Sequence, residues 1–309
     1  MRARLEAACD VDVHPGEGAI GREALLHGVG GKQALVCLLT DRVDREVIEA
    51  GTSLRIIANI AVGYDNVDVA CARERGVVVT NTPDVLTEAT AEFTWALILA
   101  VTRRVAEGER LLRRGAWTGW ALDLLLGMEL RGKRLGIVGL GRIGAAVAAR
   151  APAFGMSVAC HSLPGDVPAR PASPLGAPVI DQISLDELLS TSDVVTLHVP
   201  LTPATRHLID RNALVRMKRT AYLVNTARGS VVDEEALVWA LGERLIAGAA
   251  LDVYEREPLV HPSLPALENV VLAPHLGSAT TETRTAMADL AVSNVLAVLD
   301  GREALTPVT

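Results

Sequence analysis

The sequence has 309 residues, half of them hydrophobic, and a formal net charge of -7 at pH 7, which is enough material for one large or two medium domains. Basic residues form no long run, so the composition excludes a surface built to bind nucleic acid. The longest purely apolar stretch, residues 95–101, is far shorter than the roughly 20 residues that cross a bilayer. Four cysteines lack the spacing of a metal site or a disulfide framework. We therefore expect a soluble, cytoplasmic protein with no metal ion and no nucleic-acid or membrane partner.

Residues 1–87 show a short alternation of strands and helices. Apolar runs predict three strands, and the segments between them predict two helices: 35–40, 54–61 and 77–82 for the strands, 45–50 and 67–75 for the helices. A last helix, 281–300, has no strand after it and could return to this part of the chain. We therefore predict a small flavodoxin-like α/β domain formed by residues 1–87 and 277–309.

An apolar helix is predicted from Thr87 to about Gly115, with acidic residues in its first turns and arginines toward its end, as the helix dipole favours. So long a helix would link two domains or pair two subunits. Because an apolar helix between domains needs cover beyond its own chain, we expect this helix and the loop from Trp117 onward to form the surface of a homodimer.

From residue 131 onward the chain repeats a β-α-β pattern. Six apolar runs predict strands: 135–140, 157–162, 193–200, 221–226, 248–253 and 269–274. The pattern is typical of a doubly wound parallel sheet of the Rossmann type. Residues 88–276 are therefore predicted to be a dinucleotide-binding domain inserted in the smaller domain, and the proline-rich segment 164–178 to be an ordered, irregular loop.

The segment GLGRIG comes directly after a predicted strand and directly before a predicted helix. In that position Gly139 permits the turn, Gly141 lets a pyrophosphate approach the backbone, and Gly144 lets the helix pack closely on the strand. Arg142 and Ile143, between the glycines, are assigned to the same cofactor site. A glycine-rich turn without a ligand would look similar, but the strand, turn and helix context favours dinucleotide binding.

The residue expected to meet the cofactor's ribose lies about 20 positions after the glycines, at the end of the next strand, and is Ser162. A carboxylate here would bond the 2′-hydroxyl of NADH, whereas a serine leaves room for a 2′-phosphate and can donate to it. NADPH is therefore favoured over NADH. The usual adjacent arginine is missing, because Leu163 follows, and Arg170 would have to reach in from the loop. Use of NADH therefore stays open.

Seven motifs, in order along nearly the whole chain, resemble the D-isomer-specific 2-hydroxyacid dehydrogenase family: VGYDNVD (62–68), TPDVLTEATAEF (82–93), GLGRIG (139–144), HVPLTPATRHLI (198–209), NTARGSVVDEEAL (225–237), LDVYEREP (251–258) and PHLGSAT (274–280). The resemblance implies an NAD(P)-dependent enzyme that reduces a 2-keto acid to the D-2-hydroxy acid. It also implies the catalytic set Arg228, Glu257 and His275, whose spacing along the chain matches that of the family.

The chemistry of these three residues agrees with the reaction. Arg228 can hold a carboxylate and polarise a carbonyl, because a guanidinium binds oxygen pairs in a fixed geometry. His275 can donate the proton, since imidazole titrates near working pH. Glu257, bonded to the other ring nitrogen, would keep the imidazole charged for reduction. Taken singly, Arg228 could instead be a cation at a helix terminus, Glu257 a solvated acid and His275 a buried histidine. Because the three residues occur together at the ends of successive strands, a catalytic role is favoured.

The resemblance implies further ligands. The backbone N–H groups of Val62 and Gly63 would hold the substrate carboxylate with Arg228, although VGYDN could also be a simple strand-to-helix turn. Asp252 is expected on the nicotinamide side. The remaining residues expected at the cofactor are Pro200, Thr205, Ala227 and Gly277.

Within the family, TPDVLTEATAE followed by GAWTGW resembles the glyoxylate and hydroxypyruvate reductases most closely, so a small 2-keto acid is the predicted substrate. Leu124 stands where some relatives carry an aromatic residue, which leaves the choice of keto acid open. The alternatives are a reductase of another 2-keto acid and a nucleotide-sensing, corepressor-like binding protein. The segment RARLEAACDVDV resembles the family's first helix and second strand, so we expect a late start, without the usual opening strand.

Overall fold

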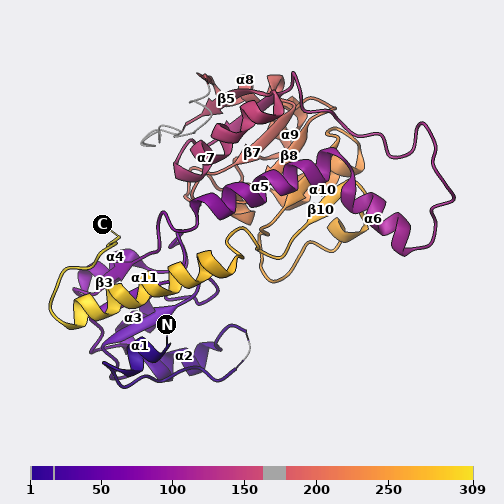
Figure 1. The fold of residues 1–309 in the computed structure, drawn as a ribbon. Helices are drawn as coiled ribbons and strands as arrows, with labels where there is room; N and C mark the ends of the chain where they lie inside the picture. The colour runs from indigo at the N-terminus through magenta and orange to yellow at the C-terminus, as the bar shows by residue number, and fades with distance from the viewer. Residues whose placement is uncertain (1, 17, 163–178, 309) are drawn as a thin grey trace. The chain divides into compact units, whose positions relative to one another are not determined.

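The computed structural model describes residues 2–16, 18–162 and 179–308. The chain forms two compact units (Figure 1): unit 1 contains Met1–Leu86 and Ala279–Thr309, and unit 2 contains Thr87–Ser278. These boundaries lie within one or two residues of the predicted ones. The proline-rich segment 164–178, predicted as an irregular loop, lies outside the described residues.

Unit 1 is built on a parallel sheet with the strand order β1-β2-β3, namely β1 (Ala34–Cys37), β2 (Ile56–Asn59) and β3 (Val78–Thr80). Alternate residues of a strand point to opposite faces. Ile57 accordingly packs with α2 (Arg22–Val29), α3 (Arg45–Ala50) and α4 (Val69–Glu74). Ile56 and Ala58 pack with α1 (Arg2–Glu6) and α11 (Thr281–Leu299) on the other face. The last helix therefore belongs to unit 1, as the sequence predicted.

The beginning of unit 1 differs from the expectation in two places. Residues 10–13, expected as a strand, form no ladder, because Val11 packs against the α11 side of the core while Val13 is exposed. The helix α2 was not predicted, since its sequence REALLHGV contains a glycine and offers only two fully buried residues, Leu25 and Val29.

Among the described residues, the sheet of unit 2 has seven parallel strands in the order β10-β9-β8-β7-β4-β5-β6. Their bounds are β4 (Arg134–Val138), β5 (Ser157–His161), β6 (Ile180–Gln182), β7 (Val194–Leu197), β8 (Tyr222–Asn225), β9 (Gly248–Leu251) and β10 (Val270–Leu272). The chain runs outward from β4 through β5 to β6 and then returns to β7 on the other side of β4. This reversal is the switch point of a doubly wound sheet, so the predicted fold class is confirmed.

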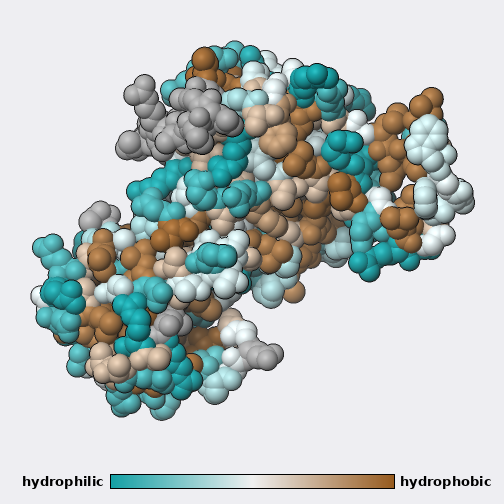
Figure 2. Space-filling view, viewed as in Figure 1, coloured by the Kyte–Doolittle hydropathy of each residue, from teal (hydrophilic) through white to brown (hydrophobic). Residues whose placement is uncertain are grey.

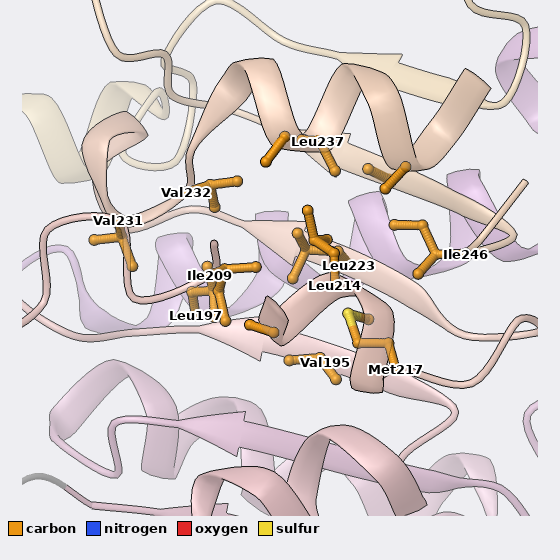
Figure 3. Close-up of a cluster of buried hydrophobic side chains, with 14 of the residues drawn as sticks. Val195, Leu197, Ile209, Leu214, Met217, Leu223, Val231, Val232, Leu237 and Ile246 are labelled. Carbon is orange, nitrogen blue, oxygen red and sulfur yellow. The ribbon is translucent and has the colours of Figure 1, made fainter. Parts of the chain in front are cut away.

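Helices cover both faces of this sheet. One face carries α8 (Leu185–Thr191), α9 (Arg211–Arg216) and α10 (Glu234–Gly242), whose apolar residues pack with Val195, Leu197 and Leu223 (Figure 3). The other face carries α5 (Thr87–Thr102) and α7 (Arg142–Arg150), which is followed by the 3-10 turn η1 (Ala151–Phe154). Two short 3-10 turns, η2 (Gly229–Val231) and η3 (Leu264–Ala266), lie in loops after strands. Side-chain caps begin α8, α9 and α10, at Ser184, Asp210 and Asp233.

The long helix predicted from Thr87 to Gly115 is wrong in its length. It ends as α5 at Thr102, and a separate helix, α6 (Val105–Arg113), begins after Arg104, which adopts a left-handed conformation with φ 54°. The break is held by the loop after α6, because the Met128 N–H donates to the Thr102 carbonyl at 2.8 Å.

Much of α5 is covered by its own chain. Its apolar residues Ala91, Trp95, Leu97, Ile98 and Val101 are buried inside unit 2, where Trp95 stacks on Phe154 and donates to the Val147 carbonyl of α7. The helix α6 has no buried residue, and the loop that follows it extends away from the sheet of unit 2 (Figure 1).

Three further features of the described residues concern membrane-spanning helices, metal-binding clusters and cysteines. No helix in the described ranges is both long and apolar enough to cross a membrane. Across the same ranges, no three His, Cys, Asp or Glu side chains are placed to hold a metal ion together. The four cysteines Cys9, Cys37, Cys71 and Cys160 are free thiols.

Candidate active site

The three predicted catalytic residues lie in loops at one edge of the unit 2 sheet. Arg228 follows β8, Glu257 follows β9 and His275 follows β10, and these strands are neighbours in the sheet. Because parallel strands end at the same edge, their following loops meet there. The glycine-rich turn follows β4 at the same edge, so the catalytic set and the dinucleotide motif lie on the same side of unit 2.

Glu257 and His275 form a direct pair. The distance between Glu257 Oε2 and His275 Nδ1 is 2.8 Å, and each side chain is 27% exposed. The other carboxylate oxygen of Glu257 accepts a hydrogen bond from the Tyr254 N–H at 3.0 Å, which fixes the carboxylate toward the ring. Burial alone would raise the pKa of Glu257, but the hydrogen bond to His275 and its charge outweigh this, so the pKa is lowered. The glutamate is therefore an ionised partner for the histidine.

Arg228 lies in a loop shaped by the last residue of β8. The buried Asn225 side chain donates to the Arg228 carbonyl at 2.9 Å and accepts from the Ala227 N–H at 3.0 Å. The guanidinium of Arg228 is close enough for its charge to contribute to the lowered pKa of Glu257. Thus the structure brings all three predicted catalytic residues together.

The loops after β8 and β9 are in direct backbone contact. A Cβ added at Gly229, the neighbour of Arg228, would lie 1.8 Å from the carbonyl carbon of Tyr254, in the loop that carries Glu257. Only a glycine permits this approach. The sequence therefore sets the spacing between Arg228 and Glu257 through a residue that takes no part in the chemistry.

Asp252 lies at the end of β9 and bonds to the loop that carries His275. The residue is 1% exposed, and its carboxylate oxygens accept the N–H groups of Leu276 at 2.6 Å and Gly277 at 2.8 Å. Its carbonyl accepts the His275 N–H at 2.8 Å. Burial raises the pKa of Asp252, although the two backbone bonds oppose this. Asp252 thus holds the loop that carries His275, which itself has a left-handed φ of 55°, and both of its carboxylate oxygens are already used within the protein.

The glycine-rich turn has the geometry that a dinucleotide requires. Gly139 has φ 93°, and a Cβ there would lie 2.8 Å from the backbone of His198. A Cβ at Gly144 would lie 2.2 Å from the Gly139 carbonyl oxygen. At Gly141, which precedes the first turn of α7, a Cβ would meet nothing within 4 Å. The first and third glycines are required by packing, and the second leaves space in which a pyrophosphate can reach the N–H groups of α7.

Other predicted cofactor residues lie around this turn. Ser162 follows β5, and its buried hydroxyl has no partner among the described residues other than the thiol of Cys160, which is a weak one. A buried hydroxyl with so weak a partner, near a turn open to a pyrophosphate, fits a nucleotide that brings its own polar groups. Arg142 is exposed in the first turn of α7, whereas Ile143 packs against the core on the α5 side.

Pro200 and Thr205 lie in the loop after β7 and differ in their exposure to solvent. Pro200 is exposed. Thr205 is completely buried, and its hydroxyl donates to the Pro200 carbonyl at 2.6 Å and accepts from the Thr202 N–H at 2.7 Å. Thr205 therefore shapes the loop that presents Pro200. Ala227 is half-buried in the Arg228 loop.

Val62 and Gly63 belong to unit 1, in the loop that follows β2. Both residues are half-buried, and their carbonyls accept hydrogen bonds from the side chains of Asn81 and Asn59. Sequence reasoning missed these two asparagines, as it missed Asn225. The available signal was an amide side chain at or just beyond the carboxyl end of a buried strand, where an apolar residue would otherwise stand.

The comparisons with known proteins agree with this site. Residues 95–277 match the family profile described as "D-isomer specific 2-hydroxyacid dehydrogenase, NAD binding domain". A glyoxylate reductase of Thermofilum pendens is 50% identical over 301 residues, which cover 96% of this chain and 87% of the relative.

Two solved structures are similar over most of their length. The TT0316 protein of Thermus thermophilus has a TM-score of 0.89 at 50% identity, and the match covers 99% of this chain and 96% of that one. The NADPH-dependent glyoxylate/hydroxypyruvate reductase of Sinorhizobium meliloti, solved with NADP and malonate, has a TM-score of 0.79 at 39% identity, covering 94% and 86%.

A doubly wound sheet with a glycine-rich turn and a carboxylate-supported histidine at the same edge defines a nicotinamide-dependent dehydrogenase. The chain belongs to the D-isomer-specific 2-hydroxyacid dehydrogenase family. The resemblance found in the sequence is thereby confirmed, including its glyoxylate reductase branch.

Proposed function

We propose that this protein reduces glyoxylate or hydroxypyruvate to the corresponding hydroxy acid, with a nicotinamide dinucleotide as the reductant. The observation that carries the proposal is the pair formed by His275 and the ionised Glu257, 2.8 Å apart, with Arg228 nearby. The relatives named glyoxylate reductase support the substrate class. A binding protein that only senses nucleotides would not need this paired acid, so that alternative is not favoured.

Each residue has a role that follows from its chemistry. The Arg228 guanidinium of unit 2 binds a carboxylate and polarises the keto group, and in unit 1 the N–H groups of Val62 and Gly63 are donors for a carboxylate. His275 donates a proton to the keto oxygen, and Glu257 stabilises the imidazolium that does so. A bound nicotinamide supplies the hydride that reduces the keto carbon.

NADPH is the cofactor that we propose for the reaction. Ser162 presents a hydroxyl, with only the Cys160 thiol as a weak partner, where NAD-binding proteins of this fold carry a carboxylate. A 2′-phosphate would meet no negative side chain at Ser162 and could accept a stronger hydrogen bond from its hydroxyl. The solved relative of Sinorhizobium meliloti is described as NADPH-dependent.

We also propose that the protein is a homodimer and works in the cytoplasm. Exposed apolar side chains gather on α6 and the loop that follows it, and Figure 2 shows hydrophobic atoms on this projecting part: Val105, Leu112, Trp117, Trp120, Leu122 and Leu126. A second copy of the chain would cover them. The four free cysteines suit a reducing compartment.

Steady-state rates of glyoxylate and hydroxypyruvate reduction, each with NADPH and with NADH, test the function and the cofactor together. We expect turnover with both acids and a lower KM for NADPH. In a Ser162→Asp variant the preference should move toward NADH, because the new carboxylate repels a 2′-phosphate and can bond a 2′-hydroxyl. Turnover with NADH alone would refute the cofactor proposal, and inactivity toward both acids would refute the function.

A further inference from the structure

Two consecutive peptide groups after β2 are fixed from one side by the segment that follows β3. The Ala61 carbonyl accepts a hydrogen bond from the Thr82 N–H at 2.8 Å. The Val62 carbonyl accepts one from the Asn81 side-chain amide, also at 2.8 Å. In a planar trans peptide the N–H points to the opposite side from the carbonyl. The N–H groups of Val62 and Gly63 therefore both face away from Asn81 and Thr82.

These two N–H groups are available to a ligand. Within the described part of the chain, neither donates a hydrogen bond to another group. Asn59, the last residue of β2, donates to the Gly63 carbonyl at 2.9 Å and so fixes the next peptide as well. Adjacent N–H groups held in this way form a binding concavity for an anion.

Asn81 is itself held by the C-terminal segment. The Thr306 hydroxyl donates to the Asn81 carbonyl at 2.7 Å, and the Asn81 N–H donates to the Thr306 carbonyl at 3.3 Å. Thr306 is held in turn by the completely buried Asn294 of α11. The Asn294 side-chain amide donates to the Thr306 hydroxyl at 2.9 Å, and its side-chain oxygen accepts the Thr306 backbone N–H at 3.0 Å. The backbone of Asn81 is thus fixed, which leaves its side-chain amide directed at the Val62 carbonyl.

We propose that Asn81 is a positioning residue for the substrate carboxylate. Its amide keeps the peptide between Val62 and Gly63 in the orientation that turns the Gly63 N–H toward the anion, and Thr306 keeps Asn81 in place. This inference rests on the proposed function, in which these N–H groups bind the carboxylate of the keto acid. Without the amide this peptide can rotate, and one of the two donors is lost. Proton and hydride transfer use other groups, so substrate binding should change while turnover does not.

The test compares Asn81→Ala with the wild-type enzyme. We expect the KM for glyoxylate to rise about tenfold, the effect of one charge-assisted hydrogen bond. At saturating substrate kcat should stay within about twofold, and NADPH binding measured by fluorescence should not change. Hydrogen exchange in a peptide covering residues 60–66 should become faster. The variant Thr306→Val should shift the KM in the same direction by less, and Asn81→Gln, which keeps an amide donor, should recover part of the affinity.

Asn269→Ala is the matched control. Its side chain is also a half-buried amide that donates to a backbone carbonyl, that of Ala247 at 3.2 Å, but it lies in unit 2 at the amino end of β10. It should lower the melting temperature without raising the KM. If Asn81→Ala fails to fold, Thr306→Val carries the test.

An unchanged KM in a folded Asn81 variant would overturn the inference, whether or not hydrogen exchange becomes faster. Failure of the proposed function gives a different result, because the wild-type enzyme itself would then reduce neither keto acid, and both proposals would fall.

Discussion

The pair of Glu257 and His275 determines the pH range of the proposed reaction. Because the pKa of Glu257 is lowered, its carboxylate stays ionised as the pH falls through about 4.3, where an ordinary glutamate takes up a proton. The wild-type enzyme should therefore keep its activity at about pH 5.

Glu257→Gln removes the charge and keeps the shape. We expect kcat to fall, because the imidazolium that donates the proton loses its anionic partner. The matched control is Glu255→Gln in the same loop, whose carboxylate pairs with His207 instead. A Glu257→Gln variant that kept the wild-type kcat would contradict the assigned role.

Single residues were predictable where their chemistry is tied to spacing along the chain. Arg228, Glu257 and His275 follow neighbouring strands, so parallel pairing alone brings them to one edge. The role of Asp252 was not predictable, because it depends on hydrogen bonds between two loops distant in sequence. The same holds for Asn81, since its partner Val62 lies on another strand's loop.

The positions of the loops after β8 and β9 depend on each other, because their backbones are in contact at Gly229 and Tyr254. In Gly229→Ala the new methyl would collide with the Tyr254 backbone, which cannot yield as a side chain would. The loops carrying Arg228 and Glu257 should separate, and a displacement of about 1 Å can lower kcat/KM about a hundredfold. The melting temperature should fall as well.

The control for this variant is Gly242→Ala, at the end of α10, where a Cβ meets nothing within 4 Å. There the substitution should leave kcat/KM unchanged and raise stability slightly, because alanine is the better helix former. Similar effects of Gly229→Ala and Gly242→Ala would mean that the close approach of the two loops does not set the geometry of the site.

The strands were predictable because buried parallel strands form continuous apolar runs. The failures occur where tertiary contacts override a local pattern. No proline or glycine follows Thr102 until Gly108, so the sequence gives no stop signal there, but the hydrogen bond from Met128 and the left-handed Arg104 end the helix. The strand β6 (Ile180–Gln182) was missed because it is short, at the edge of the sheet, and largely exposed, so that it lacks the apolar run of a buried strand.

At the scale of the whole molecule, the break between α5 and α6 moves the expected surface for a second subunit from the whole predicted helix to α6 and the loop after it. The residues of α5 are covered within unit 2, whereas α6 and the loop after it leave Trp120 80% and Leu122 81% exposed. A monomer would expose these apolar side chains to water at a cost of about 25 cal/mol per Å². A closed pair of identical chains removes the surface from both copies by the same contact.

Light scattering should accordingly give twice the mass of one chain for the wild-type protein. Placing two carboxylates in the contact, in Trp120→Asp with Leu122→Asp, should give a monomer, because unpaired charges are costly to bury. Val215→Asp is the control, since Val215 is 60% exposed on α9, away from α6 in the sequence, and should leave the mass unchanged. A monomeric wild-type protein would contradict the dimer, and a double variant that remained dimeric would place the interface on another surface of the molecule.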